Sequence, residues 1–195
     1  SYRKLQEAEE GEVMSHRITV FGAGAWGTTM AQVLHDAGND VLLWGRSDDV
    51  VGEINNSHTN TKYLDGHVLP SELRATSNIT EAFEHTHIYV LAIPAQQLRT
   101  MLEQWKPLVK PDAIVISTLK GIEISTQMRM SEIIEEMWGV SKVGVITGPN
   151  LADELVLRQP AGAVAAAPTQ DRADFIRDLF RTPYYRTYTS TDVMG

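Results

Sequence analysis

The sequence has no cysteine among its 195 residues. Disulfide bonds, a thiolate nucleophile and zinc sites built on cysteine are therefore excluded. The same absence fits a reducing compartment, and we expect the protein to be cytoplasmic.

Basic residues are scarce relative to acidic ones, 17 against 25, and the formal net charge is −8. This balance argues against nucleic acid as a partner, because contact with a phosphate backbone depends on positive charge. A small anionic ligand is still compatible with this charge balance. A few local cations and backbone N–H groups can bind such a ligand although the net charge of the protein is negative.

Long hydrophobic runs are lacking as well. No apolar run approaches the roughly 18 residues that a membrane span needs, so no membrane insertion is expected. The first thirteen residues are charged and lack the apolar segment of a secretory signal. We interpret residues 1–15 as an N-terminal arm or a cloning remnant, with Met14 as a natural start.

Two kinds of catalytic site have no signature in the sequence. The six histidines show no i, i+4 spacing on one predicted helix and no evident acidic partner, so no metal site is predicted. A G-x-S-x-G motif is also absent, which excludes the nucleophile elbow of a hydrolase.

The sequence does contain a regular alternation of short apolar, β-rich runs with longer segments of helical period. The predicted strands are residues 17–21, 40–44, 87–93, 113–118, 143–147 and 161–166. The predicted helices are residues 25–37, 47–56, 78–84, 95–104, 126–138 and 169–180, and residues 55–73 are predicted to form a loop over the sheet. This alternation predicts an α/β domain over residues 16–195, a Rossmann-like, doubly wound and mostly parallel sheet with helices on both faces.

A glycine-rich turn joins the first predicted strand to the first predicted helix, in the pattern Gly22-x-Gly24-x-x-Gly27. In this context the pattern indicates dinucleotide binding. Gly22 permits a tight turn, Gly24 lets a pyrophosphate approach the backbone, and Gly27 lets the helix pack close to the sheet. The N-terminus of the helix then offers free N–H groups to the phosphates. The alternative is a strand-to-helix turn without a ligand.

The end of the second predicted strand bears on the choice of cofactor. An acidic residue there would hold the ribose hydroxyls of NAD, but the chain has Arg46 just beyond the strand. A guanidinium at this place either stacks on adenine or meets a 2′-phosphate, so both NADPH and NADH remain candidates. Asp48 and Asp49 come later and are predicted to begin the next helix.

Two further loops follow predicted strands, at the edge where doubly wound sheets bind ligands. One carries Lys120, which suits binding of a phosphate or polarisation of a carbonyl. The other carries Gly148 and Asn150, and Asn150 is predicted to cap the helix that follows. Both loops also have a plain structural reading, as a surface lysine and an ordinary helix start.

Six segments together resemble the NAD(P)-dependent glycerol-3-phosphate dehydrogenases of the bacterial type. They are GAGAWGTTMA (22–31), LWGR (43–46), YLDGHVLP (63–70), LAIPAQQLR (91–99), KGIE (120–123) and TGPNLADEL (147–155). The resemblance implies reduction of dihydroxyacetone phosphate to sn-glycerol 3-phosphate with NAD(P)H, a step that supplies glycerophospholipid synthesis. A non-catalytic NAD(P)-sensing module and another hydroxyacid-type dehydrogenase are the alternatives.

The resemblance also implies roles for single residues. The cofactor-binding set is Gly22, Gly24, Ala25, Trp26, Gly27, Arg46, Tyr63, Lys120 and Ala152. The substrate-binding set is Lys120, Gly148 and Asn150, and Lys120 is the catalytic candidate that binds or polarises the substrate. The chain departs from the family in having Ala25 where serine is common, and Asn150 where serine or threonine is common.

The family's general acid/base lysine and its all-helical substrate domain lie beyond Gly195, the last residue of this sequence. We therefore expect residues 1–195 to be inactive alone. An apolar patch near residues 184–195 is expected to drive self-association, and a homodimer is one form it would take.

Overall fold

The computed structural model describes residues 14–141 and 143–194, so residues 1–13 of the expected N-terminal arm lie outside the described part. Its centre is an eight-stranded sheet in the order β10-β9-β8-β7-β6-β1-β2-β5. The strands are β1 (Arg17–Phe21), β2 (Asp40–Trp44), β5 (Arg74–Thr76), β6 (Ile88–Leu91), β7 (Ile114–Ser117), β8 (Gly144–Thr147), β9 (Ala161–Ala166) and β10 (Tyr185–Ser190). From β5 to β8 all neighbours are parallel, whereas β9 runs antiparallel to β8 and pairs in parallel with β10. The predicted mostly parallel, Rossmann-like sheet is confirmed.

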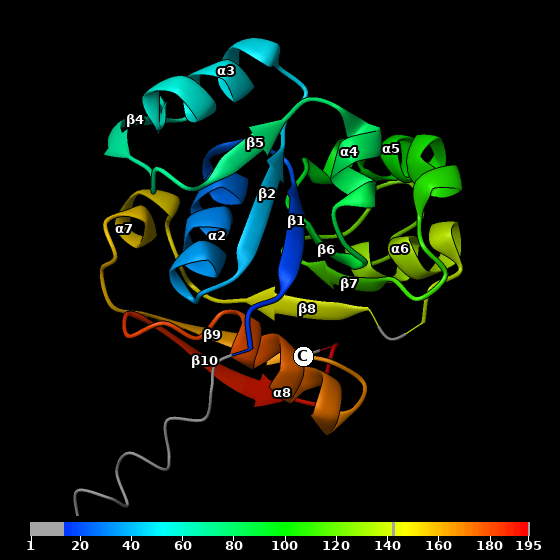
Figure 1. The fold of residues 1–195 in the computed structure, drawn as a ribbon. Helices are drawn as coiled ribbons and strands as arrows, with labels where there is room; N and C mark the ends of the chain where they lie inside the picture. The colour runs from blue at the N-terminus through cyan, green and yellow to red at the C-terminus, as the bar shows by residue number, and fades with distance from the viewer. Residues whose placement is uncertain (1–13, 142, 195) are drawn as a thin grey trace, which may run out of the picture.

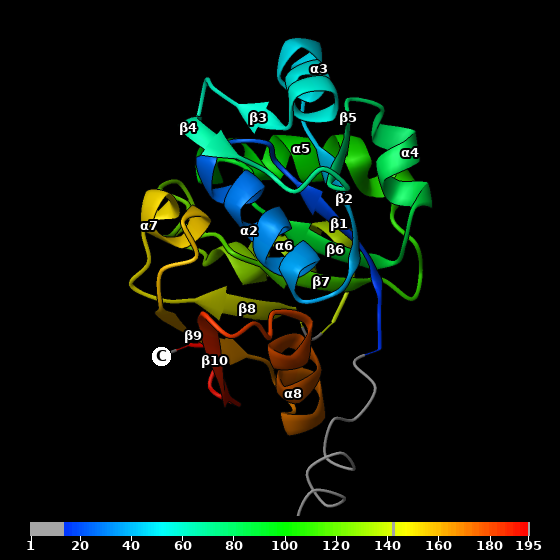
Figure 2. The same cartoon turned by 60° about the vertical axis from the view of Figure 1, so that its left-hand side comes forward.

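Helices cover both faces of the sheet (Figures 1 and 2). One face packs against α2 (Ala25–Asp36), α3 (Asp48–Ser57), α7 (Ala152–Val156) and α8 (Gln170–Leu179). The other packs against α4 (Ile79–Glu84), α5 (Leu98–Trp105) and α6 (Met130–Trp138). Two 3-10 turns, η1 (Ala95–Gln97) and η2 (Lys106–Leu108), flank α5. Among the described residues, no helix has the length and apolar character that crossing a membrane requires.

The strands bury both faces, which explains their nearly continuous apolar sequences. All four residues of β6 are buried, and so are the last four of β1. On the α4–α6 side the core is aromatic, with the rings of Phe21 and Phe83 4.7 Å apart between centroids. A fully buried side chain of this size stabilises the fold by about 1.5–3 kcal/mol.

Most predicted elements occur within a few residues of their predicted bounds. Three predictions were wrong. Residues 55–73 are not a plain loop, because β3 (Thr59–Asn60) and β4 (Leu64–Val68) form an antiparallel hairpin there. The strands β5 and β10 were missed, since β5 has only three residues and β10 has the polar sequence YRTYTS. The predicted helix at 126–138 begins only at Met130, after a loop closed by a bridge between Ile122 and Arg129.

Local signals set several helix ends as predicted. Asn78 caps α4 by accepting hydrogen bonds from the N–H groups of Thr80 and Glu81. Gly38, with a φ of +93°, follows the end of α2 in the left-handed region that glycine tolerates. Asp48 and Asp49 lie in the first turn of α3, where their charge suits the helix dipole.

Candidate functional site

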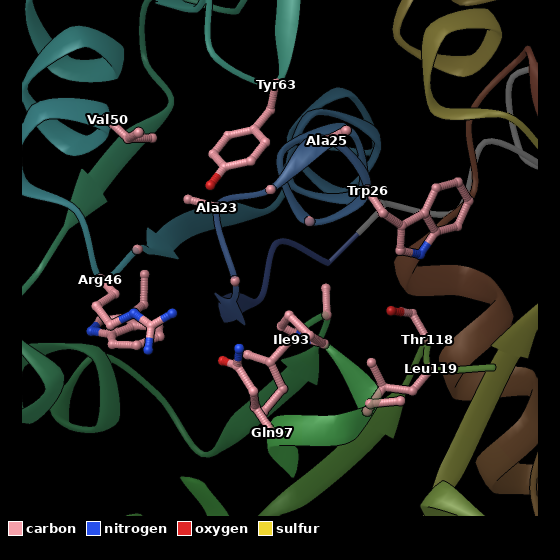
Figure 3. Close-up of a pocket in the computed structure, with 18 of the residues that line it drawn as sticks. Ala23, Ala25, Trp26, Arg46, Val50, Tyr63, Ile93, Gln97, Thr118 and Leu119 are labelled. Atoms are coloured by element: carbon pink, nitrogen blue, oxygen red, sulfur yellow. The ribbon is translucent and has the colours of Figure 1, made fainter. Parts of the chain in front are cut away.

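A cavity of about 670 Å³ lies across the carboxyl ends of β2, β1, β6 and β7 (Figure 3). The chain proceeds from β1 through β2 to β5 on one side, then crosses to β6 on the other side of β1. This reversal is the point where open α/β sheets bind their ligands. Three strand spacings of about 4.8 Å make the site about 14 Å wide, so it suits an elongated ligand.

The glycine-rich turn forms the floor of the cavity, and each glycine has its own steric surroundings. Gly22 has a φ of +120°, and a Cβ there would meet the Ala92 carbonyl oxygen at 2.5 Å. A Cβ on Gly27 would lie 1.7 Å from the carbonyl oxygen of Gly22. A Cβ on Gly24 would meet no atom within 4 Å. Gly22 and Gly27 are thus required by the turn itself, whereas Gly24 leaves space on the side where a ligand approaches.

The first turn of α2 leaves its N–H groups free for an anion. Its N-cap is Gly24, which offers no side-chain cap, and the turn contains no acidic residue. The first N–H groups of an α-helix have no partner within the helix, and here they belong to Ala25, Trp26 and Gly27, which all line the cavity. The helix dipole adds a partial positive charge. This end of α2 is therefore an anion-binding site in its geometry.

The charge of the cavity has the opposite sign to that of the whole protein. Among the residues that the structure describes, three cations line it, Arg46, Lys62 and Lys120, and no carboxylate does. The chain as a whole has a formal net charge of −8. A cleft lined by one sign of charge concentrates ligands of the other sign, so this cavity favours a polyanion.

Arg46 lies at the end of the cavity beyond β2, opposite Thr118 and Leu119 beyond β7 (Figure 3). The side chain of Arg46 is exposed, and within the described part of the chain it makes no ion pair. The preceding Gly45 is packed against the glycine-rich turn, because a Cβ on it would lie 2.7 Å from the Cβ of Ala23. Arg46 is thus presented to the cavity on a tightly packed backbone.

Tyr63 belongs to the turn between β3 and β4 and reaches over Ala23 with its hydroxyl toward the cavity (Figure 3). Its side chain is 44% exposed. Lys62 lies beside it, with its Nζ 5.2 Å from the centroid of the Tyr63 ring. Sequence reasoning singled out Tyr63 through the resemblance and missed Lys62, which directly precedes the motif that begins at Tyr63.

Lys120 and the loop after β8 meet at the edge of the cavity. The Nζ of Lys120 donates a hydrogen bond to the carbonyl oxygen of Gly148 at 2.9 Å. A Cβ on Gly148 would lie 2.5 Å from the Gly162 carbonyl oxygen and 2.6 Å from the Asn150 Nδ2. Gly148 itself does not line the cavity but supplies the carbonyl that orients Lys120.

One prediction about this loop needs correction. The N-cap of α7 is Leu151, not Asn150. The Asn150 amide instead lines the cavity and donates to the Gly162 carbonyl oxygen at 3.2 Å. Because the Asn150 side chain bonds to Gly162 of β9, it does not cap α7. Ala152 is the first residue of α7 and does not line the cavity.

The loop that carries Lys120 is anchored by an ion pair. Arg99 of α5 donates to both carboxylate oxygens of Glu123, with its Nε 2.9 Å from Oε1 and its Nη2 2.9 Å from Oε2. Hydrogen bonds from Arg99, and then from Thr126, lower the pKa of the Glu123 carboxyl to about 2. The pair joins the segment after β6 to the loop after β7, so both walls of the cavity are tied together.

Sequence reasoning assigned no role to the wall between these loops. It consists of Ile93, Pro94, Gln97, Met101, Thr118 and Leu119. The signal was available, because these residues end or follow the predicted strands at 87–93 and 113–118. In the described part of the chain, no group of three or more histidine, aspartate or glutamate side chains is placed to hold a metal ion.

Comparison with known proteins assigns the chain to a family. A family model described as the N-terminus of NAD-dependent glycerol-3-phosphate dehydrogenase matches residues 17–173. The chain belongs to this family. The resemblance drawn from the six sequence segments is thereby confirmed.

Relatives and solved structures agree with this assignment. Glycerol-3-phosphate dehydrogenase (NAD(P)+) of Corynebacterium glutamicum is 47% identical over 180 residues, which are 91% of this chain and 54% of the relative. The enzyme of the same name from Streptomyces avermitilis is 44% identical over 181 residues, 92% of this chain and 54% of the relative. The chain therefore spans about half the length of the curated relatives it matches.

Among solved structures, glycerol-3-phosphate dehydrogenase from Coxiella burnetii superposes with a TM-score of 0.85 at 25% identity, covering 92% of this chain and 55% of that one. The glycerol-3-phosphate dehydrogenase of Saccharomyces cerevisiae gives 0.83 at 28% identity, covering 92% and 57%. A pyrroline-5-carboxylate reductase from Coxiella burnetii, at 16% identity and a TM-score of 0.67, shares the fold alone.

Proposed function

We propose that this chain is the cofactor-binding part of an enzyme that interconverts dihydroxyacetone phosphate and sn-glycerol 3-phosphate with NAD(P)H, in the cytoplasm, supplying glycerophospholipid synthesis. Residues 16–195 form the dinucleotide-binding domain in this proposal, and the rest of the protein supplies an all-helical substrate domain. The observation that carries the proposal is the cavity: an uncapped helix N-terminus and three cations line it, and no carboxylate of the described chain does.

The cofactor residues lie in an order that follows an extended dinucleotide. Arg46 holds the adenosine end beyond β2, with Tyr63 over the middle of the cavity. The N–H groups that follow Gly24 face the pyrophosphate at the switch point between β1 and β6. The nicotinamide end then falls beside Thr118 and Leu119, next to Lys120.

When bound, the nicotinamide supplies or accepts the hydride. Lys120 acts on the substrate at the same end. An ammonium group has three N–H donors, and the Gly148 carbonyl takes one of them. The other two are available to a substrate phosphate or to the carbonyl oxygen, whose developing negative charge they stabilise. Asn150 offers its amide from the neighbouring loop. The general acid/base lysine lies outside residues 1–195 in this proposal.

Calorimetric titration of this chain with NADPH and with NADH tests the proposal directly. We expect at least one nucleotide to bind with a Kd of about 10–100 μM, or roughly −5.5 to −7 kcal/mol, because the pyrophosphate cradle is complete in this chain. Nicotinamide mononucleotide, which lacks the adenosine half, should bind far more weakly and serves as the control. Absence of binding by both dinucleotides at millimolar concentration would contradict the proposal.

Self-association, including a homodimer, is a further part of the proposal. Tyr188 and Met194 near the C-terminal end are 63% and 76% exposed, and Val164 beside Tyr188 in the sheet is 36% exposed. Uncovered apolar side chains of this kind favour contacts between molecules. Light scattering should give a mass above that of a monomer, lowered by Tyr188→Ser. A monomer at all concentrations would contradict this part alone.

A further inference from the structure

Asn60 is a fully buried polar residue that lies outside the cavity, close behind the glycine-rich turn. It belongs to β3 and has no exposed surface. Its Nδ2 donates two hydrogen bonds, to the Ala23 carbonyl oxygen at 3.0 Å and to the Thr28 Oγ1 at 2.9 Å. Ala23 lies within the turn and Thr28 in the first part of α2. One amide group therefore holds the turn and the helix that follows it.

The same residue also determines where the β3–β4 turn sits. The carbonyl oxygen of Asn60 accepts a hydrogen bond from the N–H of Tyr63 at 3.2 Å. The intervening Thr61 is fixed from outside, because its N–H donates to the Glu53 Oε1 at 2.7 Å. Lys62 and Tyr63 therefore project over the cavity from a turn anchored at Asn60 on the inside and at Glu53 of α3 on the outside.

The burial of Asn60 makes the two hydrogen bonds of its side chain important for the stability of this region. A buried amide is costly unless its donors are satisfied, and both bonds of the Asn60 Nδ2 go to the turn–helix segment. Its Oδ1 has no partner among the described atoms, so nothing else in the described chain competes for the orientation of the side chain. Among the described residues, the Asn60 side chain thus bonds only to the glycine-rich turn and to the start of α2.

We propose that Asn60 is a positioning residue for cofactor binding, which fastens the Tyr63 turn to the glycine-rich turn so that both meet the dinucleotide in one fixed arrangement. The inference rests on the proposed function, since it concerns the same cavity. Preorganisation of this kind lowers the cost of binding, because the two segments need not be ordered by the ligand. Asn60 itself does not touch the cofactor.

The test is a double-mutant cycle on the NADPH Kd, measured by calorimetry well below the melting temperature. Asn60→Ala should weaken binding about tenfold. In a Tyr63→Ala background the same change should weaken binding less than threefold, because the segment that Asn60 positions no longer contributes its ring. Thr28→Val, which removes only one of the two acceptors, should give an intermediate loss and keeps the test usable if Asn60→Ala does not fold.

Asn55 supplies the matched control. Its amide also makes two hydrogen bonds to backbone groups, donating to the Ala75 carbonyl oxygen at 2.9 Å and accepting from the Ala75 N–H at 2.8 Å. Asn55 is more exposed and joins α3 to β5, away from the cavity. Asn55→Ala should lower the melting temperature and leave the NADPH Kd unchanged.

The outcomes separate the two proposals. If the wild-type chain binds NADPH and both Asn60→Ala and Thr28→Val bind it with the same Kd, the positioning role is overturned. The proposed function then remains intact. If Asn60→Ala weakens NADPH binding by the same factor in the wild-type and the Tyr63→Ala backgrounds, the coupling between Asn60 and Tyr63 is overturned. A wild-type chain that binds neither dinucleotide overturns the proposed function, and the inference with it.

Discussion

Gly27→Ala is expected to lower the free energy of unfolding by about 3 kcal/mol, at the upper end of overpacking costs, and to weaken NADPH binding at least about 100-fold. The added methyl group would lie 1.7 Å from the Gly22 carbonyl oxygen, a backbone atom that a side-chain rotation cannot move. Either α2 or the turn must shift. The N–H groups in the first turn of α2 then no longer converge on the pyrophosphate.

Gly24→Ala provides the control for this prediction. Its added methyl group meets no atom within 4 Å, and its backbone φ of −77° is allowed for alanine, so the free energy of unfolding should hardly change. Binding should still weaken, because the methyl group stands where the pyrophosphate approaches. Denaturant unfolding and calorimetry on both variants check the pair. Equal stability of Gly27→Ala and the wild type would show that the close approach of α2 to the turn is not required.

Arg46→Glu is expected to weaken NADPH binding about 100-fold and to leave NADH binding within about threefold, which shifts the preference of the chain toward NADH. A charge-assisted hydrogen bond to the 2′-phosphate contributes about 1.5–3 kcal/mol, and the introduced carboxylate adds repulsion. A carboxylate at the end of β2 also matches the residue that holds the ribose hydroxyls of NADH. Competition between the two dinucleotides, on the wild type and on the variant, measures the shift.

Two comparisons identify the source of this effect. Arg186→Glu makes the same change in net charge on β10, outside the cavity, and should leave both affinities unchanged. Arg46→Leu removes the charge without repulsion and should weaken NADPH alone. If Arg46→Leu weakens NADPH and NADH equally, Arg46 stacks on adenine and does not read the 2′-phosphate.

Much of the fold could be predicted because its signals are local. The strands β1, β2 and β9 occur at the predicted residues, since each is a short apolar run between turn or helix signals. The turn at Gly22–Gly27 was predictable for the same reason, because the spacing of its three glycines lies within one strand–turn–helix unit of the sequence. The Ala92 carbonyl oxygen that a Cβ on Gly22 would meet comes from a distant segment and was not predictable. The edge strands β5 and β10 were not, because one is very short and the other is as polar as a loop.

Some residues of the site could likewise be predicted from local signals, and others could not. Gly24, Arg46 and Lys120 could be placed from sequence, since each follows a strand and parallel strands end at one edge of the sheet. The partners of these residues could not. Lys120 binds the Gly148 carbonyl 28 residues away, and the Asn150 amide turns to Gly162 and leaves α7 uncapped.

The sequence by itself therefore determined the α/β alternation, the dinucleotide-type turn and, through its motifs, the family of this protein. Only the tertiary structure decided the sign of the charge in the cavity, the place of Lys62 in it, and the contact of Asn60 with Ala23 across 37 residues. Periodicity and turn chemistry depend on neighbours along the chain. The character of a binding site depends on which distant segments the packed sheet brings together, and on which partners remain for a side chain once it is buried there.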